Sequence, residues 1–263
     1  MEPTLQFLEK SKAIIEKVGL QKDKIIQAAE WCAGSILQNR LTHLFGSGHS
    51  RIMIEEMWPR YGSFPGFNPI VELSLSFHNL VVGANGQRQA MFLENVSGLA
   101  ERILRNFDLK KTDTALVVSS SGCNVVPVEI AREFQKHQIR VIAIVSMDHL
   151  QQSTSKMPDG SKLTNHADLV LDTGAPAGDA MVKIEGLETP VAPGSTVGGA
   201  LLINCLKAEI ANILVKNGKK PKVLTGAAVV GAKKAVELFE SAYDEHAHLM
   251  ARLYENVGKN VTG

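Results

Sequence analysis

The sequence has few of the features that mark secreted, membrane-spanning or metal-stapled proteins. Its three cysteines, Cys32, Cys123 and Cys205, are odd in number, widely spaced and not in CxxC pairs, which argues against a disulfide framework and a structural zinc site. No signal-peptide-like apolar run follows Met1, and no apolar run approaches the roughly 18 residues of a membrane-spanning helix. We therefore expect a cytoplasmic protein that is not exported and does not bind a membrane.

The sequence also lacks an excess of charge of either sign. Lys and Arg total 28 and Asp and Glu total 27, so the net charge of +1 gives no global attraction to nucleic acid or anionic lipid, and we expect no nucleic-acid partner. Six lysines between Lys216 and Lys234 form a local basic stretch that favours solvated helices, with nucleic-acid or subunit contact as the minor alternative. The sequence has no HExxH metal-binding motif, so we expect neither a metal nor another cofactor.

Apolar periodicity predicts the fold class. Spacings of three and four predict two helices, from Leu5 through Val18 and from Ile25 through Leu37. Continuous apolar runs then alternate with helical segments, and such strands are typical of a parallel sheet covered on both faces. We predict an α/β, doubly wound single domain over 1–263, with N-terminal helices at 1–40, a core at 41–218 and a C-terminal helical extension at 219–263. The predicted strands are 41–45, 69–75, 114–118, 140–146 and 168–172; the main later helices are 92–107, one around Val128, Ala131 and Phe134, and 196–215.

Two Ser/Gly loops follow predicted strands. In a doubly wound sheet the ligand lies at the carboxyl ends of the strands, where GSGHS at 46–50 and SSSGCN at 119–124 fall. Serine hydroxyls and helix N-terminal N–H groups can bind an anion there, although a tight turn with a Ser cap is the alternative for the first loop. Neither loop is a GxGxxG fingerprint or a P-loop. Ser195 and Thr196, before the long helix, are either a third donor pair or a helix cap.

The motifs together resemble the sugar isomerase (SIS) domain family, most closely its phosphoheptose isomerase-like proteins. They are GSGHS followed by Glu56 and Arg60, then VSSSG at 118–122, GDAMVKIEGL at 178–187 and GSTVGGALLIN at 194–204. The resemblance covers about 41–224. It implies a five-stranded parallel, flavodoxin-like sheet, phosphosugar ligands, and homodimers or homotetramers with active sites at subunit interfaces.

The resemblance also implies roles for the two loops. In the first loop, Ser47, His49 and Ser50 would line one side of the pocket. In the second loop, Ser119, Ser121 and Asn124 would hold the phosphate. Asn124 stands where many SIS domains carry Ser or Thr, but its amide keeps hydrogen-bond donors. A sulfonated or other anionic sugar is therefore an alternative to a phosphorylated one.

Aldose–ketose isomerisation through an enediol requires a base for the carbon-bound proton and a donor at the oxygens. The resemblance implies Glu56 as the base, and the adjacent Glu55 is the alternative base. A non-catalytic alternative for Glu56 is an i,i+4 ion pair with Arg60 on the same helix. Glu94 is a second candidate because apolar neighbours would raise the pKa of its carboxyl group. A plain surface glutamate is equally compatible with the Glu94 pattern.

The histidine partner is not where the resemblance implies it. Phosphoheptose isomerases carry it in the long helix, where this sequence has Leu202, Ile203 and Asn204. By position His49 is the best replacement, and His78 and His246 are further alternatives.

Cys123 lies in the second loop but has no positioned base, which disfavours a nucleophilic role. The sequence thus predicts an isomerase interconverting an anionic aldose and its ketose. A non-catalytic SIS module that senses a sugar phosphate is the alternative.

Overall fold

The computed structural model describes residues 1–76 and 86–257 and contains a five-stranded parallel sheet. The strand order is β2-β1-β3-β4-β5, so the chain reverses its direction of winding between β1 and β3. This confirms the predicted α/β, doubly wound fold. The strands are β1 (Thr42–Gly46), β2 (Phe67–Ile70), β3 (Thr114–Val118), β4 (Arg140–Val145) and β5 (Leu169–Asp172).

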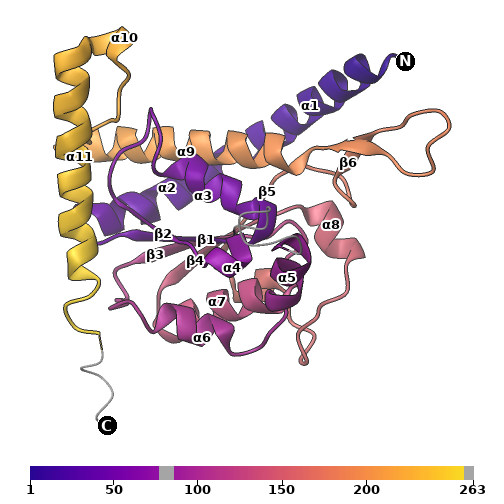
Figure 1. Cartoon of the computed structure of the whole chain (residues 1–263), viewed down its shortest axis with the longest axis horizontal. Helices are drawn as coiled ribbons and strands as arrows, with labels where there is room; N and C mark the ends of the chain where they lie inside the picture. Colours follow the sequence, from indigo (N-terminus) through magenta and orange to yellow (C-terminus); the bar gives the residue numbers. More distant parts are fainter. Residues whose placement is uncertain (77–85, 258–263) are drawn as a thin grey trace.

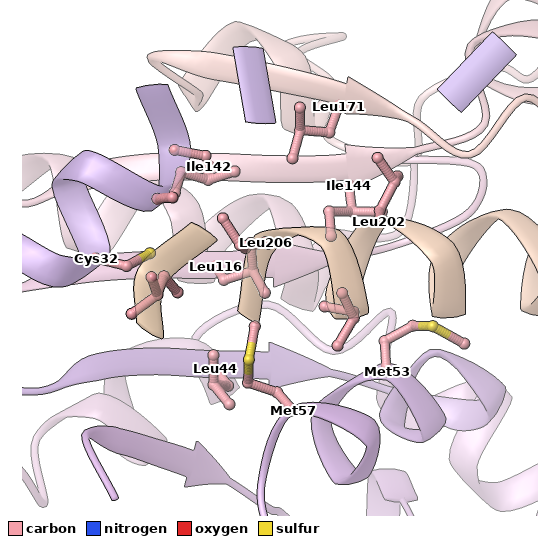
Figure 2. Close-up of a cluster of buried hydrophobic side chains, with 14 of the residues drawn as sticks. Cys32, Leu44, Met53, Met57, Leu116, Ile142, Ile144, Leu171, Leu202 and Leu206 are labelled. Atoms are coloured by element: carbon pink, nitrogen blue, oxygen red, sulfur yellow. The ribbon is translucent and has the colours of Figure 1, made fainter. Parts of the chain in front are cut away.

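Helices cover both faces of the sheet (Figure 1). One face carries α1 (Pro3–Gly19), α2 (Lys22–Leu37), α3 (Arg51–Met57) and α9 (Ser195–Lys216), and the other carries α6 (Leu99–Leu104) and α7 (Val125–Lys136). Alternate strand residues face opposite ways, as the two-residue period of a strand requires. Leu44, Leu116 and Ile142 belong to the first core, where Figure 2 shows them near α9. Phe45 and Val117 belong to the second core.

α9 is the central helix of the first core. Within residues 1–76 and 86–257 it is the one helix long and apolar enough to cross a membrane, as judged by length and composition alone. Its residues Leu202, Leu206 and Ile210 are buried within the fold, and Figure 2 shows the first two among the sheet residues and the methionines of α3. Packing against the sheet thus accounts for the apolar composition of α9.

Two predicted elements differ from the structure. The strand predicted over 69–75 is instead Phe67–Ile70, followed by the short helix α4 (Leu73–Ser76), whose first turn is held by hydrogen bonds to Glu72. The single helix predicted over 92–107 is two helices, α5 (Gly86–Leu93) and α6. Gly98 separates them with a φ of 84°, and its N–H donates to Glu129 at 2.9 Å. The left-handed backbone at Gly98 ends any continuous helix.

The first helix exposes part of its apolar face. The side chains of Leu5 and Leu8 are 50% and 51% exposed, whereas Ile14 and Val18 are buried. The reason is that α1 packs on α9 and on the short strand β6 (Ala180–Val182) through one side only, and its N-terminal part projects from the body (Figure 1). The spacing therefore predicted the helix, and the structure leaves Leu5 and Leu8 on the part of its apolar face that the fold does not cover.

The remaining elements complete the chain around this core. The C-terminal extension is mainly one long helix, and its lysines pair with acids at the surface, as in Lys222 with Glu245 at 3.4 Å. The elements are the 3-10 helices η1 (Gly48–Ser50) and η3 (Leu163–His166), the helix α8 (Met147–Gln152), the hairpin of β6 (Ala180–Val182) and β7 (Val191–Pro193), and the helices α10 (Ala227–Val230) and α11 (Ala232–Arg252).

Candidate functional site

A cavity of about 240 Å³ lies at the carboxyl ends of the strands. The loops after β1 and β3, the helices α5 and α8 and the start of α9 contribute its walls. This is where a doubly wound sheet places ligands, at the reversal between β1 and β3. The predicted site residues that line the cavity are Ser47, His49, Ser50, Glu94, Ser119, Ser121, Asn124, Ser195 and Thr196.

Glu94 links the two predicted loops. Its carboxylate accepts a hydrogen bond from Ser47 Oγ at 2.9 Å and another from Asn124 Nδ2 at 2.7 Å. Its backbone carbonyl accepts from the N–H of Val126 at 2.9 Å, which ties the end of α5 to the start of α7. Burial raises the pKa of Glu94, and this outweighs the lowering effects of Ser47, of the Lys156 charge and of Asn124. A firmly held carboxyl group with a raised pKa therefore lines the cavity.

The second loop presents hydroxyl groups beside the N-terminus of α7. The oxygen of Ser119 accepts from the N–H of Gly122 at 3.2 Å, and that of Ser121 accepts from the N–H of Cys123 at 3.4 Å. Each hydroxyl still has its proton to donate, and one N–H of the Asn124 amide is not used by Glu94. These donors and the helix terminus can bind anionic oxygens.

The start of α9 already holds a carboxylate. Asp179 accepts hydrogen bonds from the N–H groups of Gly194 and Ser195, at 3.0 and 2.6 Å, and from Ser195 Oγ at 2.7 Å. Ser195 and Thr196 line the cavity, but the Ser195 hydroxyl donates to Asp179. Because a second anion would meet the Asp179 charge, the α7 end of the cavity is the better place for an anionic ligand group.

Glu56 does not line the cavity. Its carboxylate accepts from Asn204 Nδ2 at 2.7 Å and pairs with Arg60, while Lys207 Nζ donates to its backbone carbonyl at 2.6 Å. Burial alone would raise the pKa of Glu56, but the hydrogen bonds from Asn204 and Arg60 and the charges of Arg60 and Lys207 hold it below the ordinary value. The helix α3 turns Met53 toward the cavity and Glu56 toward α9. Within this chain the structure therefore favours the pairing alternative for Glu56.

The other candidates lie in different surroundings. His49 has an exposed side chain in the cavity wall. His246 lies on α11 against the ring of Trp58, at 5.2 Å between centroids, where burial lowers its pKa; it does not line the cavity. His78 is outside the described residues. Burial raises the pKa of Cys123, the opposite of what a thiolate nucleophile needs.

Sequence reasoning missed five polar residues that line the cavity, namely Gln87, Ser120, His149, Thr173 and Asp179. His149 and Thr173 follow the carboxyl ends of β4 and β5, so the rule that led to the first two loops could have found them. Gln87 reaches the cavity only through the packing of α5, which no local pattern indicates. Across residues 1–76 and 86–257, no group of three or more His, Cys, Asp or Glu could hold a metal ion.

A profile of the SIS domain matches residues 6–146, so the match takes in both N-terminal helices and the first four strands of the sheet. The chain belongs to the SIS domain family. Its relatives include two UPF0309 proteins of Halalkalibacterium halodurans. One is 32% identical over 247 residues, covering 93% of this chain and 96% of the relative. The other is 34% identical over 212 residues, covering 81% and 85%.

Among solved structures, this SIS protein is similar to a phosphoheptose isomerase from Neisseria gonorrhoeae, with a TM-score of 0.48, 16% identity, and 80% of this chain and 96% of that one covered. It is also similar to the sugar isomerase domain of an RpiR transcription factor from Sphaerobacter thermophilus, with a TM-score of 0.47, 14% identity, and 92% and 98% covered. At these scores neither likeness bears on the activity of this SIS protein.

Proposed function

We propose that this SIS protein is a cytoplasmic isomerase that interconverts a phosphorylated or otherwise anionic aldose and its ketose through an enediol. The observation that carries the proposal is the Glu94 carboxyl group, which is held by Ser47 and Asn124 in the wall of the cavity and has a raised pKa. A carboxylate whose pKa lies closer to neutrality is a stronger base than an ordinary surface glutamate.

The reaction needs proton transfers only. Glu94 takes the proton from the carbon beside the carbonyl group, and the electron pair of that C–H bond forms the carbon–carbon double bond of the enediol as the carbonyl oxygen gains a proton. Return of a proton to the neighbouring carbon, with loss of a hydroxyl proton, gives the isomer. The sugar is neither oxidised nor reduced overall, so the chain's own acid–base groups suffice.

The anionic end of the sugar is assigned to the second loop. Ser119, Ser121 and the second N–H of Asn124 can donate to its oxygens, and the positive end of the α7 dipole lies beside them. The other end of the cavity is less suitable because Asp179 occupies the start of α9. A volume of about 240 Å³ suits a single small ligand.

The first test is a thermal-shift screen of sugar phosphates and sulfonates, followed by proton NMR of each stabilising sugar in deuterium oxide. We expect at least one ligand to show deuterium at carbon 2 and slow conversion to its isomer. Glu94→Gln should abolish the exchange, while Glu101→Gln, a matched change at an exposed position, should retain it. If Glu56→Gln loses the exchange and Glu94→Gln keeps it, Glu94 is not the base.

A sugar-phosphate sensor is the second candidate. It is favoured by the absence of a histidine at the position that the resemblance implies, where Leu202 and Ile203 are buried and Asn204 is bonded to Glu56. A sensor would show ligand-induced stabilisation in the wild type without any deuterium exchange. That result would contradict the isomerase proposal.

We also propose that the chain forms a homo-oligomer through α1. Leu5, Leu8 and Ile15 are half exposed on this helix, and Ile15 continues into an apolar groove between α1, α2 and α9 that includes Ile26 and Leu201. A second copy can cover this row with the same row, as a two-fold interface requires. Light scattering should show an oligomer for the wild type and a smaller species for Leu8→Glu. A monomeric wild type would refute this assembly.

A further inference from the structure

We infer that His149, assisted by the hydroxyl of Ser120, exchanges protons with the sugar oxygens while Glu94 acts at carbon. The inference rests on the proposed isomerase function and supplies its second catalytic group. It is carried by two buried polar atoms, His149 Nδ1 and Ser120 Oγ, which belong to residues that line the cavity and have no hydrogen-bond partner in the described part of the chain.

Unpartnered buried polar atoms are uncommon because each costs free energy that a hydrogen bond would recover. Here two of them belong to residues that line one cavity, and both residues follow the carboxyl ends of adjacent strands, β3 and β4. A rotation of each side chain toward the cavity would let a ligand with neighbouring hydroxyl and carbonyl oxygens satisfy both. The pair therefore indicates where the sugar's oxygens bind.

The backbone holds this pair in place. The hydroxyl of Ser146 accepts from the N–H of His149 at 3.1 Å and donates to the carbonyl of Ala175 at 2.8 Å, which fixes the first turn of α8. The N–H of Ser146 donates to the carbonyl of Ser120 at 2.9 Å, so the second loop and α8 are joined directly. Met147 donates its N–H to Asp172 at 2.9 Å. These bonds are the kind of support that a proton-transfer group needs.

The other histidines are less suitable. His49 lines the cavity with an exposed side chain, and His246 packs on Trp58 away from the cavity. His149 is half-buried, lines the cavity, and has one ring nitrogen screened from water. Neutral imidazole has one N–H donor and one acceptor nitrogen, so it can give a proton to one oxygen and take one from its neighbour.

The proton transfers balance across the cavity. As Glu94 breaks the C–H bond, the imidazole N–H gives its proton to the carbonyl oxygen, forming the O–H bond of the enediol. The same ring then takes a proton from the adjacent hydroxyl as a new carbonyl group forms and Glu94 returns its proton to the neighbouring carbon. Ser120 donates a hydrogen bond to one of the two oxygens and so keeps them within reach of the ring.

The experiment measures isomerisation by the full-length protein on the sugar identified by the exchange screen. His149→Gln keeps a hydrogen-bonding side chain but cannot carry a proton, so kcat should fall about 10²- to 10⁴-fold, with KM changed by less than about threefold. Ser120→Ala should cause a smaller loss. His137→Gln, an exposed histidine at the end of α7, is the matched control and should retain full activity.

A second variant guards against a folding defect. In His149→Ala, added imidazole should restore part of the lost kcat, which a misfolded protein would not show. If His149→Gln keeps kcat within threefold of a catalytically active wild type, or if imidazole does not rescue His149→Ala, the assignment of His149 is wrong while the isomerase function stands. A wild type without exchange or turnover on any sugar of the panel would overturn both.

Discussion

Glu94→Gln should remove catalysis while changing the stability of the fold only slightly. Glutamine has the shape of glutamate, so its carbonyl oxygen can still accept from Asn124, and its amide can donate to the Ser47 hydroxyl, which reverses its role. The side chain can thus keep both contacts. What it loses is the ability to take a proton from carbon.

The magnitudes of the two effects differ widely. Exchanging charge-assisted hydrogen bonds for neutral ones costs about 1 kcal/mol, and removing a buried carboxylate offsets part of this cost. For a chain of this size the melting temperature should move by no more than about 2–4 °C. Loss of a general base should reduce the rate about 10²- to 10⁴-fold, which corresponds to about 2.7–5.4 kcal/mol in the activation barrier.

The pH dependence supplies a second reading of the same variant. Because the folded-state pKa of Glu94 is raised, the folded protein binds this proton more tightly than the unfolded chain does. The wild type should therefore lose stability relative to Glu94→Gln as pH rises from the unfolded pKa through the folded one, with no further change above it. Melting curves of both proteins across this range measure the difference. A difference that stays constant, or that changes in the opposite direction, would refute our account of the Glu94 environment.

Two further predictions concern stability. Asp113 has no exposed side-chain surface and pairs with Arg40 at 2.6 Å, so Asp113→Asn should lower the free energy of unfolding by about 3 kcal/mol in denaturant titrations. Burial alone would raise the pKa of Asp113, but its hydrogen bonds and charged partners lower it. The stability that this pair contributes should therefore be present above the unfolded pKa and lost as pH falls through the folded pKa. An acid titration of the wild type that shows no such loss would contradict this role of the pair. Gly198→Ala should lower the melting temperature because its Cβ would lie 1.8 Å from the carbonyl oxygen of Thr173. Gly34→Ala, in helix α2, should raise the free energy of unfolding by about 0.5–1 kcal/mol because the added Cβ would meet only open space. Equal effects of the two alanines would contradict this packing.

Much of the fold was predictable because its signals are local. The apolar β-branched runs of β3 and β4 and the long apolar pattern of α9 fix those elements without reference to distant residues. The carboxyl-end rule for doubly wound sheets then placed both serine loops at one edge, where the cavity lies. The break at Gly98 was not predicted, because it depends on Glu129, which is 31 residues away in the sequence.

The choice between the two glutamates was beyond the sequence. In the sequence, Glu56 and Glu94 both fall in segments predicted as helices with apolar neighbours, and local spacing does not say what each carboxylate will face. Packing brings Asn204 to Glu56, 148 residues away, and brings Ser47 and Asn124 to Glu94. Since a pKa depends on burial and on nearby charges and donors, only the tertiary structure could make one carboxyl group an ion-paired link between helices and the other a candidate base.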